Sequence, residues 1–171
     1  MIRFENVTKT YAGGAVKAVD SLTMEVDGGK VFGFLGPNGA GKTTTLKIMT
    51  GILNPDTGSV WLEDMELFKN PIEAKRLFGF VPDTFEMFER LTGMEYLQFL
   101  ADVYGVGEPQ RKAHFDKYLQ LFELQDAIGQ PIRSFSHGMK QKLQVIGSLV
   151  HDPRIWILDE PMTGLDPASM H

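Results

Sequence analysis

Apolar and polar positions alternate along the first part of the chain in the way that β-strands require. Ile2, Phe4 and Val7 are spaced almost evenly, and a second stretch of this kind runs from Val16 to Val26. The run Val31 to Leu35 is apolar and enters a glycine-rich segment, which predicts a short strand buried on both faces. The first 35 residues are therefore expected to form strands.

Shorter elements are expected over the next part of the chain. A helix is predicted from about Gly41 to Thr50, with Gly51 placed to cap its C-terminus. After a turn at residues 54–58, a strand is expected from Val60 to Leu62, and a short helix then leads to the strand Phe78 to Val81.

From Thr92 onward the apolar period becomes helical, with spacings of i, i+3, i+4 and i+7. Such stripes usually face a core. Pro153 ends the last helix, and Ile155 to Leu158 returns to a buried strand. This order predicts an α/β core, residues 1–84 and 152–171, interrupted by a helical subdomain at 85–151. The three stripes are Leu97, Leu100, Ala101 and Tyr104; Phe115, Tyr118, Leu119 and Phe122; and Met139, Leu143, Ile146 and Val150.

Composition excludes several classes of function. The 171 residues carry 17 Lys and Arg against 22 Asp and Glu, a net charge of -5, which argues against a surface built to hold nucleic acid. The chain has no cysteine, so it offers no disulfide, thiolate zinc site or cysteine nucleophile. No apolar stretch approaches the roughly 18 residues that span a bilayer, and the first residues do not resemble a signal peptide. The expected location is the cytoplasm, with any membrane role through a partner.

The glycine-rich segment is the strongest chemical signal. Residues 36–43, GPNGAGKT, fit the pattern G-x-x-x-x-G-K-[ST] between a predicted strand and a predicted helix. Gly39 and Gly41 let successive backbone N–H groups face one concavity, and the helix N-terminus adds positive potential. Lys42 supplies a charge to the outer phosphates of a nucleotide, the Thr43 hydroxyl can ligate Mg²⁺, and Thr44 can bond a further phosphate oxygen.

Two acids follow the strand predicted at residues 155–158. A buried strand that ends in Asp159 places a carboxylate at the carboxyl edge of the sheet, where ligands bind. Asp159 can hold Mg²⁺ through its water shell, and Glu160 can orient or deprotonate an attacking water.

Two later segments set this chain apart from other proteins with such a loop. Ser136 caps the helix that begins in the run FSHGMKQ at residues 135–141, and residues 163–167 read TGLDP. In that order, with Tyr11 ahead of the loop, the chain resembles the nucleotide-binding domain of ATP-binding cassette (ABC) transporters. The resemblance implies a P-loop NTPase core with a mixed or parallel sheet, antiparallel N-terminal strands and an inserted helical subdomain.

The resemblance also implies roles for named residues. Tyr11 would stack on adenine, and Asn38 would join the loop residues in binding nucleotide. Two subunits would pair head to tail around two Mg-ATP, and Ser136 and Gly138 of one would touch the γ-phosphate held by the other. Asp166 would lie in the D-loop between the subunits. The helical subdomain would receive a cytoplasmic helix of an integral membrane subunit, so the protein would lie on the cytoplasmic face of the membrane.

The chain departs from the family pattern in three places. The signature L-S-G-G-Q is here F-S-H-G-M, a variant found in many bacterial export-type ATPases, with His137 expected at the helix surface. Asp83 stands where the Q-loop glutamine is usual, either as a ligand of Mg²⁺ or as a plain turn residue. The chain stops at His171, soon after the D-loop, so a fragment with weak nucleotide binding and poor turnover is expected.

The function expected is the ATP-hydrolysing subunit of a membrane transporter, with Lys42 and Glu160 as catalytic residues. One alternative is a soluble ABC-type ATPase that acts on DNA or ribosomes. Against it, the helical insert lacks the sustained heptad repeat of a coiled coil, and the acidic balance of the chain does not indicate a basic surface for nucleic acid. A phosphotransferase with the same loop is the other alternative, and it leaves the signature unexplained. The resemblance implies that the membrane subunit selects the transported substrate, so these residues do not identify it.

Overall fold

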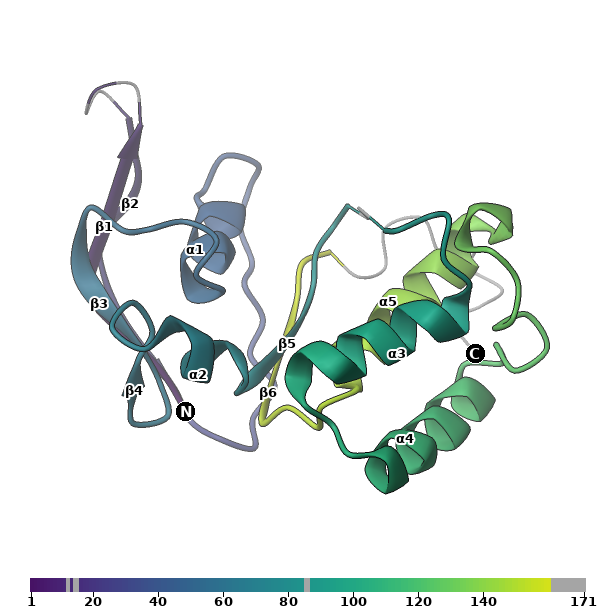
Figure 1. The fold of residues 1–171 in the computed structure, drawn as a ribbon. Helices are drawn as coiled ribbons and strands as arrows, with labels where there is room; N and C mark the ends of the chain where they lie inside the picture. Colours follow the sequence, from purple (N-terminus) through teal and green to yellow (C-terminus); the bar gives the residue numbers. More distant parts are fainter. Residues whose placement is uncertain (12, 14–15, 85–86, 161–171) are drawn as a thin grey trace. The chain divides into compact units, whose positions relative to one another are not determined.

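The chain forms two compact units, residues 1–78 and 79–171. The computed structural model describes residues 1–11, 13, 16–84 and 87–160 (Figure 1). In this described part, no helix has both the length and the apolar composition needed to cross a membrane.

The first unit is built on a four-stranded antiparallel sheet in the order β2-β1-β3-β4. Phe4, in the central strand β1, pairs with Met24 of β2 on one side and with Val60 of β3 on the other. The strands predicted from this alternation are confirmed: Phe4, Val60 and Leu62 are fully buried, while Leu22, Met24 and Val26 of β2 are half-buried. The strands are β1 (Ile2–Tyr11), β2 (Val16–Val26), β3 (Thr57–Leu62) and β4 (Met65–Glu66).

Two helices complete the first unit. Helix α1 (Lys42–Met49) buries Leu46, Ile48 and Met49 and contacts β2, and α2 (Pro71–Lys75) contacts β4. The helix predicted near Gly41–Thr50 is confirmed, and Gly51 follows it in the left-handed conformation, with φ 65°.

The strand predicted at Val31–Leu35 is wrong. The segment is irregular, and Val31 and Leu35 are 104% and 95% exposed. An apolar run becomes a strand only where a neighbouring strand satisfies its N–H and C=O groups. Among the strands described in the first unit, all of the pairing is between β1, β2, β3 and β4, and this segment pairs with none of them.

The second unit contains a small sheet of β5 (Phe78–Val81) and β6 (Ile155–Leu158). The Asp159 N–H donates to the Val81 carbonyl oxygen at 2.9 Å. The two strands therefore end at the same edge and run parallel, as the sequence predicts for the carboxyl edge that carries Asp159.

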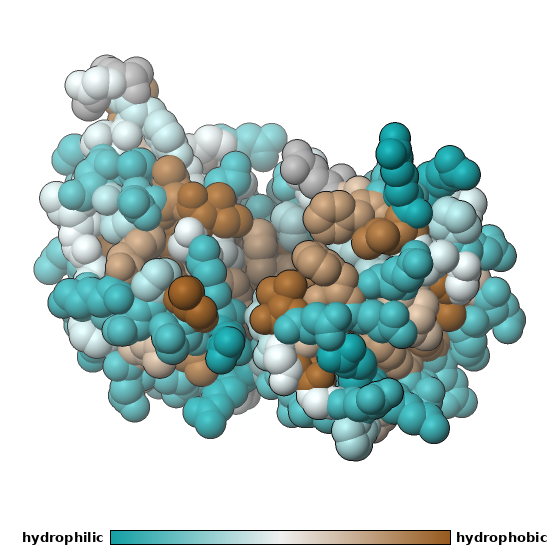
Figure 2. Space-filling model, viewed as in Figure 1, coloured by the Kyte–Doolittle hydropathy of each residue, from teal (hydrophilic) through white to brown (hydrophobic). Residues whose placement is uncertain are grey.

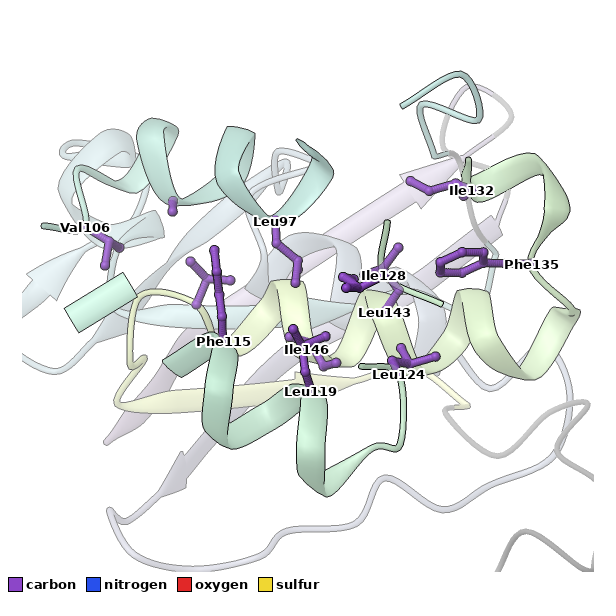
Figure 3. Packing of buried hydrophobic residues seen from close by; sticks show 12 residues of the cluster. Leu97, Val106, Phe115, Leu119, Leu124, Ile128, Ile132, Phe135, Leu143 and Ile146 are labelled. Carbon is purple, nitrogen blue, oxygen red and sulfur yellow. The ribbon is translucent and has the colours of Figure 1, made fainter. Parts of the chain in front are cut away.

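The other helical elements among the described residues of this unit are α3 (Gly93–Tyr104), α4 (Glu108–Leu121), η2, a 3₁₀ turn (Ile132–Ser134), and α5 (His137–Leu149). The predicted stripes are confirmed as core, because their side chains converge from α3, α4 and α5 (Figure 3). Each fully buried Leu or Ile contributes roughly 1.5–3 kcal/mol. The stripe members buried there are Leu97, Ala101, Phe115, Leu119, Leu143, Ile146 and Val150.

Asp56 ties the turn before β3 to strand β1. Its carboxylate accepts hydrogen bonds from the Lys9 ammonium, the Thr10 N–H and the Thr10 hydroxyl, each at 2.7 Å. Of these, the bond from Lys9 does most to lower the pKa of Asp56, which falls to about 2. The charged carboxylate is therefore the form that holds the two segments together.

This contact predicts a pH dependence of stability. Because the folded pKa of Asp56 is depressed from 3.8 to about 2, its contribution is present above pH 4 and is lost as the pH falls toward 2. The Asp56→Asn variant should have a lower free energy of unfolding than the native chain at pH 7, and this free energy should fall less as the pH is lowered to 2. Urea unfolding at pH 7 and at pH 2 measures both differences. Asp64→Asn, at an exposed position, is the matched control. Equal acid sensitivity in the native chain and the Asp56 variant would contradict the assignment.

Candidate functional site

The predicted phosphate loop closes directly onto the first turn of α1. The Ala40 N–H donates to the Pro37 carbonyl at 3.2 Å, and Gly39 and Gly41 have φ values of 83° and 84°. These left-handed conformations turn the backbone sharply just before Lys42, the first residue of α1. The loop therefore presents its amides beside a helix N-terminus that has no acidic residue in its first turn.

Gly41 is required by space as well as by conformation. A Cβ atom placed there would lie 2.1 Å from the Ala18 carbonyl oxygen in β2. That distance is far inside van der Waals contact, and the nearby atom belongs to the backbone of a paired strand. Only glycine lets the loop run this close to β2, so the sheet sets where the loop ends and α1 begins.

Lys42 folds back over the loop. Its ammonium donates to the carbonyl oxygens of Gly36 at 2.7 Å and Pro37 at 3.0 Å. The positive charge therefore lies at the mouth of the loop, where an anion would bind. Thr43 is exposed and Thr44 is half-buried in the same first turn.

Two further residues proposed from the sequence lie in the first unit. Tyr11 ends β1 and its side chain is 43% exposed. Asn38 is exposed within the loop turn.

In the second unit, the acids predicted at the sheet edge follow the paired strands. Asp159 comes directly after β6 and is buried, with a relative exposure of 7%. Glu160 is exposed and has φ 47°, a left-handed conformation that a residue with a side chain seldom adopts. Asp83 is exposed and lies just past the end of β5, the partner strand.

The signature segment begins α5 in the second unit. The Ser136 hydroxyl accepts a hydrogen bond from the Met139 N–H at 3.2 Å, which confirms the predicted N-cap. Gly138 is half-buried and His137 is exposed, as expected for a surface residue. The N-terminal turn of this 13-residue helix is thus capped at the surface of the unit.

The predicted residues therefore form two local sets. The first unit carries Tyr11 and the loop from Asn38 to Thr44, and the second carries Asp83, Asp159, Glu160 and the Ser136–Gly138 cap. Asp166 and His171 lie outside the described residues.

The chemistry of the donors fits magnesium. The Thr43 hydroxyl and the carboxylates of Asp83 and Asp159 are oxygen donors, which a hard divalent cation prefers. Within residues 1–11, 13, 16–84 and 87–160, no group of three His, Asp or Glu side chains is arranged to hold a metal without help. A magnesium ion bound at either set would therefore need ligands besides these side chains, such as phosphate oxygens and water.

The structure also shows a groove in the second unit that the sequence did not predict. Its volume is about 680 Å³, and its lining is four apolar residues, Met87, Phe88, Leu91 and Phe99, with three charged ones, Glu89, Arg90 and Arg133. We call it the 87–91 groove. Apolar side chains also reach the surface elsewhere on the chain (Figure 2). A signal was present in the sequence, because Phe99 lies off the Leu97–Ala101 stripe and so faces away from the core.

A glycine-rich loop that ends on a helix N-terminus, with a buried aspartate after a core strand, defines the P-loop class of NTPase folds. Among solved structures, an ATP-binding subunit of an ABC transporter superimposes on 99% of this chain and 70% of its own, with a TM-score of 0.91 and 31% identity. A dimeric ATP-binding cassette in a post-hydrolysis state, bound to ADP and Pi, has a TM-score of 0.86 and 25% identity, covering 99% of this chain and 78% of its own.

The family model described as ABC transporter matches residues 19–163, and the chain belongs to this family. The bacitracin transport ATP-binding protein BcrA of Bacillus licheniformis is 37% identical over 170 residues, which are 99% of this chain and 54% of that protein. The chain spans about half the length of the curated relatives it matches.

The fit of Gly41 against β2 predicts that Gly41→Ala weakens nucleotide binding. The added methyl group would displace the loop from the Ala18 carbonyl, and the left-handed backbone would cost a further 1–2 kcal/mol or so. Loss of about tenfold in ATP affinity or more is expected, measured by titration of the full-length protein with a fluorescent ATP analogue. Gly28→Ala is the control, because its Cβ would meet nothing within 4 Å. Native affinity in the Gly41→Ala variant would show that the close approach does not shape the loop.

Proposed function

We propose that the full-length protein is the ATP-binding and ATP-hydrolysing subunit of an ABC transporter. The observation that carries this proposal is the phosphate loop, in which the Lys42 ammonium lies 2.7 Å from the Gly36 carbonyl at the N-terminus of α1. Backbone amides, a helix N-terminus and a fixed lysine together suit the triphosphate of a nucleotide. Membership of the family supports ATP as that nucleotide.

Each residue of the loop has its own role in binding Mg-ATP. Lys42 offsets the charge of the outer phosphates, Thr43 offers its hydroxyl to Mg²⁺, and Thr44 bonds a phosphate oxygen. Asn38, Gly39 and Gly41 line the loop, and Tyr11 stacks on the adenine ring through its exposed side chain. Bound Mg²⁺ neutralises charge on the phosphates during hydrolysis.

The acids after β5 and β6 serve the hydrolysis step. Asp159, buried at the strand end, orients the water shell of Mg²⁺, and Asp83 takes the place of the usual Q-loop glutamine. Glu160 is exposed in a constrained left-handed turn, where its carboxylate positions the attacking water and accepts its proton.

The signature cap acts on a second subunit. The capped N-terminus of α5, with Ser136 and Gly138, offers a further anion site for the γ-phosphate bound by a partner cassette. A similar solved cassette is dimeric, which supports pairing of two subunits. Asp166 would lie between them. Because each ATP is then held from both sides, closure of the dimer depends on the γ-phosphate and hydrolysis releases it.

The remaining proposals concern the whole assembly. The core at 1–84 and 152–171 binds nucleotide, while the helical subdomain at 85–151 receives a helix of an integral membrane subunit on the cytoplasmic face. BcrA is described as a bacitracin transport protein, which supports a transport role of this kind without identifying a substrate. Weak turnover by these 171 residues alone stays a prediction. The net charge of -5 continues to disfavour an ATPase that acts on nucleic acid.

Lys42→Ala should abolish tight ATP binding. The variant loses a charge-assisted contact to phosphate, which corresponds to a drop in affinity of about 10- to 100-fold. The measurement is isothermal titration of ATP into the full-length protein. Lys47→Ala removes an exposed lysine from the same helix and is the matched control. If both variants bind ATP as the native protein does, the loop is not the nucleotide site.

Glu160→Gln should retain ATP while stopping turnover. The amide keeps the size of the side chain but cannot accept the proton from water, so the rate of phosphate release should fall about 100-fold or more. ATP should then hold two subunits together, which gel filtration with ATP detects as a dimer. Glu25→Gln, an exposed position in β2, should hydrolyse normally. Normal hydrolysis by Glu160→Gln would remove Glu160 from the reaction.

A further inference from the structure

One side of α5 buries polar residues instead of apolar ones. Gln141, Gln144 and Ser148 are buried, and their spacing of three and four residues places them on one side of the helix. Leu143 and Ile146 lie on the opposite side, in the core shared with α3 and α4. Burial of polar groups is unfavourable unless they form hydrogen bonds, so the polar side of α5 is expected to have a partner other than that core.

The polar side of α5 lies against strands β5 and β6. A Cβ atom at Gly79 of β5 would lie 2.1 Å from the Ser148 carbonyl oxygen, so the helix and this strand are in close contact. The indole N–H of Trp156, in β6, donates to the Ser148 hydroxyl at 2.9 Å, and this hydroxyl donates to the Val145 carbonyl at 2.7 Å. Ser148 therefore joins the last turn of α5 to the sheet.

Gln144 does not strengthen this joint through its side-chain oxygen. That oxygen is buried and accepts no hydrogen bond in the part of the chain that the structure describes. A buried acceptor of this kind lowers stability. The position of α5 on β6 therefore depends on directional contacts such as the bond between Trp156 and Ser148.

In the proposed dimer, this joint lies between two parts of one cassette that serve different nucleotides. Helix α5 begins after the Ser136 cap, which acts on the ATP of the partner cassette, and β6 leads to Asp159, which acts on the ATP of its own cassette. The helix rises about 1.5 Å per residue, so the cap lies about 18 Å from Ser148 along α5. A small tilt of α5 at Ser148 therefore becomes a larger displacement at the cap.

We propose that Ser148 and Trp156 are positioning residues that couple the two ATP sites of the dimer. This inference rests on the proposed function and goes beyond it, because it states how one site influences the other. The hydrogen bond between the two residues holds the signature cap at a fixed position relative to the acids after β6. When the cap of one cassette binds the γ-phosphate of its partner's ATP, the same bond places that cassette's own acids for its own ATP. Both residues act through Asp159 and the cap rather than on nucleotide.

Removal of the bond from either end tests the coupling. Ser148→Ala removes the acceptor and Trp156→Phe removes the donor, and ATP hydrolysis by the full-length protein is measured against ATP concentration. The native protein should have a Hill coefficient of roughly 1.5, within the range that two coupled sites allow, and each variant should have about 1, with kcat about fivefold lower. ATP affinity, measured separately by titration, should change by less than about twofold. The double variant should be no slower than either single one, because both changes remove the same bond.

A matched pair of residues in the first unit controls for the loss of such a bond in general. The Trp61 indole N–H donates to the Ser59 hydroxyl at 3.1 Å, but both residues lie in β3. Ser59→Ala and Trp61→Phe therefore remove the same kind of bond without releasing α5, and both should keep the native kcat and Hill coefficient. Thermal unfolding of all variants shows whether each protein is folded at the assay temperature.

Several outcomes would overturn the inference. A Hill coefficient of about 1 in the native protein, or native cooperativity in the Ser148 and Trp156 variants, contradicts the coupling. An equal loss of ATP affinity and kcat indicates a damaged nucleotide site and contradicts it too, as does an additive effect in the double variant. If Ser148→Ala does not fold, Trp156→Phe carries the same test, because it keeps an aromatic ring at an exposed position. The proposed function fails if the native full-length protein neither binds nor hydrolyses ATP, and the inference falls with it; hydrolysis without the coupling rejects the inference alone.

Discussion

The close approach of Gly41 to strand β2 is the constraint on which the phosphate loop depends. The Ala18 carbonyl leaves no space for a side chain, and the left-handed backbone there turns the chain into α1. That turn brings the Lys42 ammonium over the carbonyls of Gly36 and Pro37. The sheet of the first unit therefore helps to place the Lys42 ammonium, although Lys42 itself lies in α1 and not in the sheet.

In the second unit, residues of the buried cluster lie next to two surface features, the Ser136 cap of α5 and the 87–91 groove. Ile132 and Phe135 are both members of the core, and Ser136 follows immediately as the cap of α5. The backbone of Ile132 also holds Leu91 at the 87–91 groove. The backbone bond to Leu91 and the capped start of α5 thus both lie within residues 132–136.

Local patterns accounted for much of the fold and the candidate site. Gly39, Gly41 and Lys42 lie within the G-x-x-x-x-G-K-[ST] pattern, and the apolar stripes of α3, α4 and α5 repeat at the helical period. Both patterns can be recognised from residues close together in the sequence. Val31–Leu35 shows the limit of such patterns. Its composition suits a strand, but strand formation depends on hydrogen bonds to another strand, which composition alone does not supply.

The sequence by itself determined the chemical inventory of the loop, the acids after β6 and the serine cap of α5, because each depends on residues adjacent in the chain. Only the tertiary structure decided the contact between Gly41 and Ala18 and the pairing of Glu89 with Lys140, which are 51 residues apart. It also decided that Phe88 and Phe99 share one groove with two arginines. These features arise when packing of the core brings distant segments together, and no local spacing encodes that proximity.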